Sequence, residues 1–362
     1  MPMIQKPTLL LDKIKCRKNI SAMVSKMIKN NVDFRPHFKT HQSLEIGRWF
    51  MESGIRKITV SSIEMAEYFS PEWNDITVAF PVNIREIETI NKLAVTINLN
   101  LLVESSEAIN FLKENLKSKA GFFIKIDVGN NRSGIHPSNT GLIDAILSIS
   151  GFSDRLNFKG FLGHAGHTYK CKTRDEVTGI HNMSREVMAG LKNRYIQKYP
   201  DLKISLGDTP GCCIACDFTG IDELRPGNFV FYDLMQCRIG SCMVEQIAVA
   251  LACPVVAIHK DRGEIVVYGG SVHFSTESLE NEKEGTVYGR VAEIKENGWG
   301  QIIQGMYLKS LTQEHGIVSV PHSEILKYSI GDYLIILPVH SCITANSMKN
   351  YLTFDSEKIS RM

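Results

Sequence analysis

The sequence around Lys39 places side chains together that could carry out nucleophilic chemistry. Lys39 lies between His37 and His41 in Pro-His-Phe-Lys-Thr-His, directly after the short apolar run 32–34. A turn or strand end there would point the amine into a cavity, where desolvation lowers the pKa of a lysine. A neutral amine can attack a carbonyl carbon and form a Schiff base. Most lysines are solvated, so this interpretation depends on where the other unusual residues fall.

A second group of candidate residues lies near the C-terminus, in Pro-Val-His-Ser-Cys. In an extended segment, side chains two positions apart point to the same side. His340 and Cys342 would then present an imidazole and a thiolate to one point, a pair that suits zinc. Two protein ligands are too few for a closed structural site, so the spacing predicts an open, catalytic one.

Another cysteine pair, Cys213 and Cys216, has the C-x-x-C spacing. The sequence has no second pair of this kind and no thioredoxin-like setting around it. We therefore interpret this spacing as coincidental.

The elements that must position these residues follow an alternating pattern. Amphipathic stretches at 84–93, 108–116, 142–149 and 177–195 separate short β-like runs. Strands alternating with helices indicate a parallel sheet, and eight strands close a (β/α)8 barrel; an open doubly wound sheet is the competing interpretation. The eight predicted strands are 32–34, 58–60, 76–80, 97–103, 122–128, 158–162, 203–206 and 228–232.

The pattern changes after about residue 241. The β-rich runs 248–259 and 264–268 flank Asp-Arg-Gly, which predicts a hairpin, and further strand-like runs follow at 316–320 and 333–338. We predict an α/β domain over residues 1–245, whose first residues could join the other domain, and an antiparallel β domain over residues 246–362. The second is an ordinary size for a domain, roughly 110 to 120 residues.

Under the barrel interpretation, the unusual motifs all fall near the C-terminal ends of strands, where barrel enzymes keep their active sites. The turns around Thr209, and around Gly227 and Asn228, follow or adjoin the last two strands and could bind a phosphate. Either turn alone is better explained as a tight turn.

Four polar residues near other strand ends could line the same cavity. His164 and Tyr169 lie among glycines that allow close approach of a ligand, although both could be core residues. Arg132 and Arg225, more often surface charges, become candidates for binding polar groups of an anionic cofactor.

Composition limits the possible partners. The chain has 362 residues, 43% of them apolar, and a net charge of +2, which gives no reason to invoke nucleic acid or an anionic membrane. No apolar run approaches the roughly 20 residues that span a bilayer. The first residues do not resemble a signal peptide, and nine cysteines without a secretion signal favour reduced thiols in the cytoplasm.

With these residues assembled, the sequence resembles fold-type III pyridoxal phosphate enzymes, and more narrowly the D-threonine aldolase and D-serine dehydratase group, relatives of alanine racemase. The resemblance runs through nearly the whole chain in family order. It is carried by the motifs around Lys39, Arg132, His164 to Tyr169, Gly207 to Pro210, Arg225 to Asn228, Gln313 to Gly316, and His340 to Cys342.

The resemblance implies a barrel that binds pyridoxal 5'-phosphate, a C-terminal β domain, and a homodimer with sites near the domain and subunit interfaces. Lys39 looks like the Schiff-base lysine, and Thr209, Gly227 and Asn228 look like phosphate contacts. His164 matches a residue that packs against the pyridine ring.

Arg132 and Arg225 match positions near the phenolic oxygen or ring nitrogen of the cofactor, and we do not assign which is which. His340 and Cys342 match the metal pair of the dehydratases. Aldolases of the group tend to have a carboxylate where Cys342 stands, so the thiolate favours Zn²⁺ and β-elimination. Gly269 to Phe274 departs from the dehydratase pattern, which leaves the substrate open.

The function that the resemblance implies is a metal-assisted lyase acting on a β-hydroxy D-amino acid. D-Threonine aldolase-type cleavage and a metal-free racemase are the enzyme alternatives. A non-catalytic pyridoxal phosphate carrier is a third, although such proteins usually consist of the barrel alone.

Overall fold

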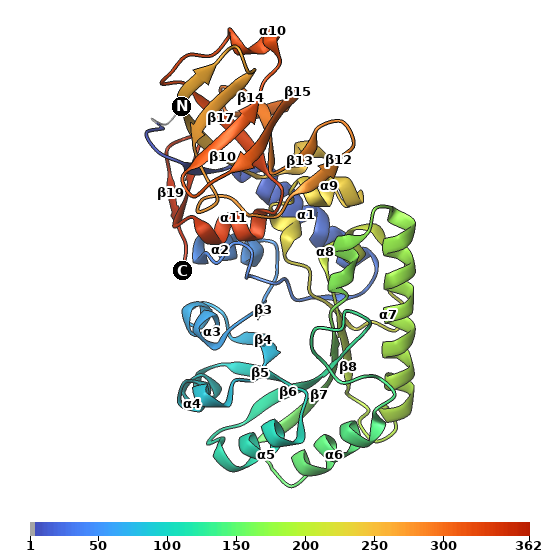
Figure 1. Ribbon diagram of the computed structural model, residues 1–362. Coiled ribbons are helices and arrows are strands. Elements are labelled where there is room, and N and C mark those ends of the chain that lie inside the picture. The colour runs from blue at the N-terminus through green and yellow to red at the C-terminus, as the bar shows by residue number, and fades with distance from the viewer. Residues whose placement is uncertain (1–3) are drawn as a thin grey trace. The chain divides into compact units, whose positions relative to one another are not determined.

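The computed structural model describes residues 4–362 and divides into two compact units (Figure 1). One unit comprises residues 21–227, which we call the barrel unit. The other combines residues 1–20 with residues 228–362, and we call it the β unit. Helix α1 (Lys13–Lys29) contains the boundary between them. Among the described residues, none of the helices combines the length and apolar character needed to cross a bilayer.

The barrel unit is built on an eight-stranded parallel sheet. Beyond the strand β2, His37 forms a parallel bridge with Thr59 of β3, which joins the two ends of the sheet. This arrangement confirms the predicted α/β fold class with a (β/α)8 barrel. In spatial order the strands are β2 (Asp33–Phe34), β9 (Glu223–Leu224), β8 (Lys203–Leu206), β7 (Leu156–Gly163), β6 (Ala120–Ile126), β5 (Asn98–Val103), β4 (Asp75–Pro81) and β3 (Ile58–Val60).

Helices lie around the outside of this curled sheet (Figure 1). Four of them begin at a serine or threonine whose side chain accepts a backbone N–H of the first turn: Ser43, Ser62, Ser105 and Thr173. Such caps satisfy N–H groups that have no partner within the helix. The helical segments are α2 (Leu44–Glu52), α3 (Ile63–Phe69), η1 (Ile84–Glu86), α4 (Ile87–Thr96), α5 (Ser106–Asn115), α6 (Thr140–Ser150), η2 (Gly166–Lys170), α7 (Arg174–Tyr195) and α8 (Thr209–Ile214).

The prediction of the eighth strand at 228–232 was wrong. The eighth strand is β9, which pairs with β2 and β8, and residues 228–230 form the short 3-10 helix η3 (Asn228–Val230). The apolar run 229–232 is buried, but not within a sheet. Arg225 and Gly227 therefore follow the last strand of the barrel rather than opening it.

The β unit contains a closed antiparallel barrel, in which each strand pairs with the next in the order β10, β11, β16, β15, β14, β17 and back to β10. The predicted hairpin is confirmed, because β10 and β11 pair antiparallel. Strand β1 from the N-terminal segment extends the sheet from β10, followed by β18 and β19. The strands are β1 (Thr8–Leu11), β10 (Val249–His259), β11 (Glu264–Tyr268), β12 (Leu279–Asn281), β13 (Gly285–Val287), β14 (Gly289–Lys295), β15 (Gly298–Leu311), β16 (His315–Ser319), β17 (Tyr333–Pro338), β18 (Asn350–Thr353) and β19 (Lys358–Ser360).

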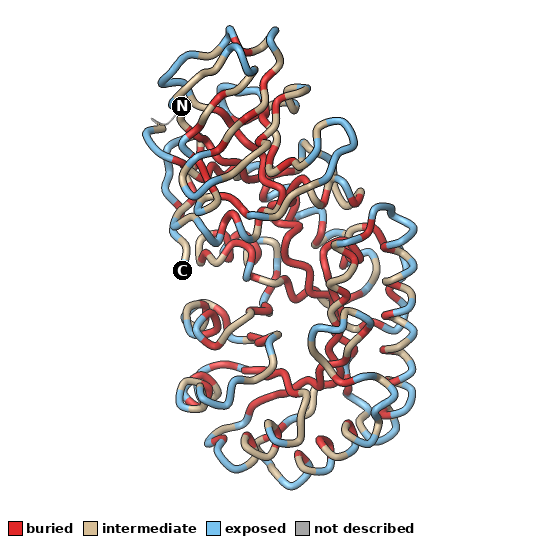
Figure 2. The backbone as a smooth tube through the Cα atoms, in the orientation of Figure 1, coloured by how far each residue is buried: buried red, intermediate tan, exposed pale blue. Residues whose placement is uncertain are grey.

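Each unit contains buried apolar residues, and Figure 2 shows buried segments in both. The helices of the β unit are short: α9 (Leu234–Ile239), η4 (Val244–Gln246), α10 (His322–Ile325) and α11 (Ser341–Ser347). All nine cysteines are free thiols, including Cys213 and Cys216.

One backbone contact in the barrel unit gives a stability prediction. Gly160 in β7 has a φ of +134°, and a Cβ there would lie 1.9 Å from the carbonyl oxygen of Lys203. We expect Gly160→Ala to lower the free energy of unfolding by about 3 kcal/mol. Gly190→Ala in α7, where a Cβ meets nothing within 4 Å, should raise it by about 1 kcal/mol. Urea denaturation measures both, and equal effects of the two substitutions would contradict the prediction.

Candidate active site

The turn that carries Lys39 is anchored by its neighbour Phe38. The Phe38 ring is fully buried and packs edge-on against the rings of Phe69 and Trp73, with centroids 5.1 and 5.0 Å away. The backbone N–H of Phe38 donates to the carbonyl of Thr59. Phe38 points into the core, whereas Lys39 is exposed.

Lys39 itself is exposed in the single chain, so the predicted burial of its amine in a cavity was wrong. The two flanking histidines differ from each other. His41 is fully buried, stacks on Phe50 and accepts the N–H of Ser43, so it is a core residue. The Nδ1 atom of His37 accepts the N–H of Lys39.

His37, Lys39, His164 and Arg225 gather at one place in the barrel unit. Burial lowers the pKa of His37 well below its ordinary value, and the charges of Lys39, Arg225 and His164 lower it further. The pKa of His164 is also held well below its ordinary value, by burial and by Lys125. Both imidazoles are therefore neutral near pH 7. His164 Nδ1 lies 2.6 Å from the carbonyl oxygen of Gly207, which can only accept, so Nδ1 carries the proton.

The loop between β6 and α6 carries Arg132. Asp127 accepts the backbone N–H groups of Gly129 and Asn131, and Gly134, with a φ of +113°, lets the chain turn back against β6. A Cβ on Gly134 would lie 2.6 Å from the backbone nitrogen of Asp127. These contacts explain why the Arg132 loop contains Asp127 and Gly134. Arg132 is exposed, whereas Arg225 is 4% exposed.

Lys125 is a residue that sequence reasoning missed. It belongs to the buried strand β6, and burial, together with the charges of Arg225 and Arg132, lowers its pKa to about 7. The signal that could have identified it is a lysine within the otherwise apolar run 122–126. Its cationic neighbours show that positive charge accumulates in this part of the barrel.

Thr209 follows Asp208, the residue that caps α8. Asp208 accepts the hydroxyl proton of Thr168 at 2.8 Å and the N–H of Gly211 at 2.6 Å. The hydroxyl oxygen of Thr209 is fully buried and makes no hydrogen bond within residues 4–362. A buried hydroxyl without a partner is costly, so this atom fits a ligand contact. Tyr169 lies in η2 next to Thr168.

Gly227 allows two loops of the barrel unit to approach each other closely. A Cβ on Gly227 would lie 2.8 Å from the carbonyl oxygen of His37 and 3.3 Å from Thr40 Oγ1. Packing against the Lys39 turn therefore requires glycine at this position. The phosphate contact of Gly227 stays a prediction.

In the β unit, Asp233 organises the segment that carries His340 and Cys342. Its carboxylate accepts the backbone N–H of Ser341 at 2.9 Å and the amide of Asn228 at 2.7 Å. The same Asn228 amide lies 3.4 Å from the sulfur of Cys342. The predicted extended conformation was wrong, because His340 caps α11 and Cys342 lies in its first turn. The two side chains nevertheless meet, since they hydrogen bond to each other.

Glu277 contributes a third group to this segment. Its carboxylate lies 2.6 Å from Nδ1 of His340, and this hydrogen bond holds the pKa of Glu277 below its usual value. Burial alone would lower the pKa of His340, but the bonds with Cys342 and Glu277 outweigh it and raise the pKa to about 11. Cys342 and Glu277 therefore both interact with the imidazole of His340.

These donors fit a metal ion. A carboxylate on Nδ1 leaves Nε2 of the imidazole to face Cys342, and metal-binding histidines commonly have such a partner. Among residues 4–362, no group of three or more histidine, cysteine or acidic side chains is placed to hold a metal, so the protein would supply two ligands. No sequence signal pointed to Glu277, which lies 63 residues away from His340.

The segment that departs from the dehydratase pattern, Gly269 to Phe274, is held against the Gln313-Glu314 motif. The N–H groups of Gly269, Ser271 and Val272 donate to the carbonyls of residues 314, 312 and 313. A Cβ on Gly270 would lie 2.3 Å from the carbonyl oxygen of Thr312, so this contact requires glycine.

Two family models match the sequence. The model described as "Alanine racemase, N-terminal domain" matches residues 11–234, and the model described as "Putative serine dehydratase domain" matches residues 248–354.

The chain is similar to known dehydratases over nearly its whole length. The D-serine dehydratase of Dictyostelium discoideum is 28% identical over 380 residues, covering 96% of this chain and 93% of the relative. The D-threo-3-hydroxyaspartate dehydratase of Delftia sp. (strain HT23) is 28% identical and covers 95% and 93%. Its solved structure superposes with a TM-score of 0.89 at 25% identity, covering 98% of this chain and 97% of that one. D-threonine aldolase from Filomicrobium marinum, 19% identical with a TM-score of 0.82 over 98% and 94%, shares the fold.

The burial of Asp208 gives a prediction of pH dependence. Burial raises its pKa to about 6, above the value of about 3.9 in an unfolded chain. Asp208 therefore binds a proton more tightly in the folded state than in the unfolded chain. Its contribution to the free energy of unfolding is fully present below pH 4 and is lost as the pH rises through 6. Relative to Asp208→Asn, the wild type should lose about 2 to 3 kcal/mol between pH 4 and 7. Denaturation of both proteins across this range measures the difference, and parallel stability curves would refute it.

Proposed function

Because the chain belongs to the family of the alanine racemase N-terminal domain, we propose that it is a pyridoxal phosphate-dependent lyase acting on a β-hydroxy D-amino acid. The reaction is the D-serine dehydratase type of β-elimination, which yields a keto acid and ammonia. The observation that carries this choice is the contact of His340 with Cys342 and Glu277, in a domain that matches the putative serine dehydratase model.

The barrel unit offers the residues that would hold the cofactor. Lys39 supplies the amine, the buried hydroxyl of Thr209 is available to the phosphate, and Arg225 and Lys125 supply positive charge. Bound pyridoxal phosphate supplies an electron sink for negative charge at the substrate Cα. We assign His164 to the face of the ring and Arg225, the buried arginine, to its nitrogen. Arg132, Tyr169, Gly227 and Asn228 remain proposed cofactor contacts.

Elimination needs a base for the Cα proton and an acid for the β-hydroxyl. Lys39 is the candidate base, because a neutral lysine amine at this position would accept the Cα proton. His340 and Cys342 would hold a divalent cation, which polarises a bound hydroxyl as a Lewis acid. The thiolate favours Zn²⁺ over harder ions such as Mn²⁺. A Cys→Ala mutant of D-threo-3-hydroxyaspartate dehydratase, which is similar to this chain, has been solved in "the metal-free form".

The test compares D-serine, D-threonine, D-allo-threonine and D-threo-3-hydroxyaspartate as substrates of the purified protein. We expect keto acid formation that stops with a chelator and returns with Zn²⁺. Glycine and an aldehyde would identify an aldolase instead, and interconversion of enantiomers without metal would identify a racemase. Borohydride treatment should fix a pyridoxyl group on Lys39.

Lys39→Ala should abolish that adduct and lower kcat by at least about 10³-fold. Lys18→Ala, at an exposed lysine, serves as the matched control. If Lys39→Ala retains the adduct or most of the activity, the assignment of Lys39 fails.

The contact between Glu277 and His340 gives a separate prediction about metal binding. Glu277→Ala should raise the Kd for Zn²⁺ by about 10- to 100-fold, because the imidazole loses the carboxylate that orients it. Competition with a chromogenic chelator measures this Kd without reference to activity. Glu282→Ala, at an exposed glutamate of the same region, should leave it unchanged. Equal Kd values for the two variants would show that Glu277 does not support the metal.

A further inference from the structure

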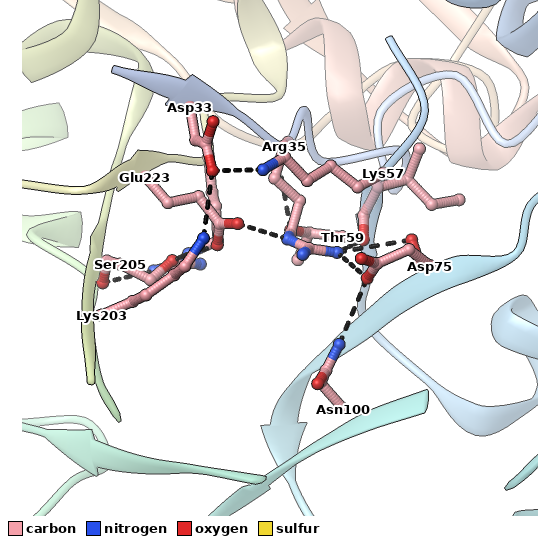
Figure 3. Close-up of polar contacts among 11 residues, drawn as sticks. Asp33, Arg35, Lys57, Thr59, Asp75, Asn100, Lys203, Ser205 and Glu223 are labelled. Atoms are coloured by element: carbon pink, nitrogen blue, oxygen red, sulfur yellow. Dashed lines mark hydrogen bonds and ion pairs between the residues drawn. The ribbon is translucent and has the colours of Figure 1, made fainter. Parts of the chain in front are cut away.

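A chain of buried polar side chains crosses the interior of the barrel unit and ends at Arg225. Figure 3 shows its central part, with Glu223 lying between Arg35 and Ser205. Arg35, Ser205, Glu223 and Arg225 are each at most 5% exposed. Charged groups are rarely buried to this extent unless they are paired.

The direction of each hydrogen bond in this chain is fixed by chemistry. Arg225 Nε lies 2.7 Å from Ser205 Oγ, and an arginine can only donate. Ser205 therefore accepts from Arg225 and gives its own proton to Glu223 Oε1, 2.7 Å away. The other carboxylate oxygen, Oε2, accepts Arg35 Nε at 2.6 Å. Both oxygens of Glu223 thus accept hydrogen bonds, which suits the ionised form.

Glu223 stays ionised despite its burial. Burial raises the pKa of this carboxyl group, but the charge and hydrogen bond of Arg35, with the hydrogen bond of Ser205, outweigh it and leave the pKa below its usual value. Arg35 is in turn held by Asp75, with Nη1 2.5 Å from Oδ1.

The orientation of the Arg225 guanidinium depends on this chain. Its Nη2 donates to the carbonyl of Gly163 at 2.6 Å, the residue before His164, and its Nε is held by Ser205. Two fixed nitrogens define the plane of the group. Among the described residues Nη1 has no hydrogen bond partner, so it is the nitrogen left for a ligand.

We propose that Glu223, acting through Ser205, is a positioning residue that fixes the orientation of Arg225 toward the pyridine ring of the cofactor. The proposal rests on the proposed function, because it takes Arg225 as the ring contact. It adds that the electronic state of the cofactor depends on a carboxylate that does not touch it. Arg35 and Asp75 hold that carboxylate from its far side.

The test uses the holoenzyme of Glu223→Gln and Ser205→Ala. The amide offers Arg35 and Ser205 one acceptor in place of two, and alanine removes the hydroxyl that links Glu223 to Arg225. We expect both variants to change the position or intensity of the visible circular dichroism band of the bound cofactor. A misplaced contact should lower kcat by about 10- to 100-fold. The KM should change by less than about 3-fold, because the substrate itself loses no contact.

Asp33→Asn is the matched control. Asp33 is another carboxylate of the same region. Its backbone pairs with Glu223 between β2 and β9, but its side chain hydrogen bonds to Lys57 and Lys203 (Figure 3). It should retain the wild-type dichroism band and kcat. If Glu223→Gln folds poorly, as its melting temperature would show, Ser205→Ala carries the test, because it removes only one hydroxyl.

The outcomes separate this inference from the proposed function. Wild-type dichroism and kcat in both variants, with normal borohydride labelling of Lys39, would overturn the role of Glu223 and leave the cofactor assignment standing. No labelling of Lys39 in the wild type would refute the proposed function itself.

Discussion

The constraint on which the barrel unit depends is the burial of positive charge. Arg35, Lys125 and Arg225 are each at most 5% exposed, and a buried cation is costly without a partner. Arg35 is bonded to Glu223 and Asp75. Arg225 is linked to Glu223 through the neutral hydroxyl of Ser205. Burial lowers the pKa of Lys125 to about 7. Among the described residues, Arg225 is therefore a buried cation without a directly hydrogen-bonded carboxylate, at the place where the proposed cofactor, an anion, would bind.

In the β unit, the corresponding constraint is the orientation of His340 and Cys342, the two residues proposed to bind a metal ion. Asp233 fixes the backbone at Ser341, so His340 and Cys342 on either side of it have little freedom. Glu277 then selects which nitrogen of the imidazole faces Cys342. The orientation of the pair thus comes from side chains that would not themselves bind the ion, and these are far apart in sequence.

Features that depend on local sequence could be predicted, whereas contacts between distant residues could not. The alternation of strands and helices, and the hairpin at 249–268, depend on local periodicity, and the sequence predicted them correctly. The two-residue strand β9 was missed because its neighbour, the apolar run 229–232, gives a stronger β signal although it is not in a sheet. The meeting of His340 with Cys342 was predicted from an extended geometry, but Cys342 lies in the first turn of α11, directly after the N-cap residue His340.

The roles proposed for Glu223 and Glu277 could not be predicted from the sequence, for a physical reason. Glu223 and Glu277 act through contacts with residues 188 and 63 positions away, and a single glutamate has no local pattern that reveals such a partner. The residues expected to touch the cofactor or metal stand in glycine-rich or histidine-containing motifs because the backbone must turn or approach closely there. Under the proposed roles, the orientation of those residues comes instead from single carboxylates that lie far away in the sequence. In this chain, the motifs therefore indicate where chemistry could occur, and under the proposed roles Glu223 and Glu277 orient the groups that would perform it.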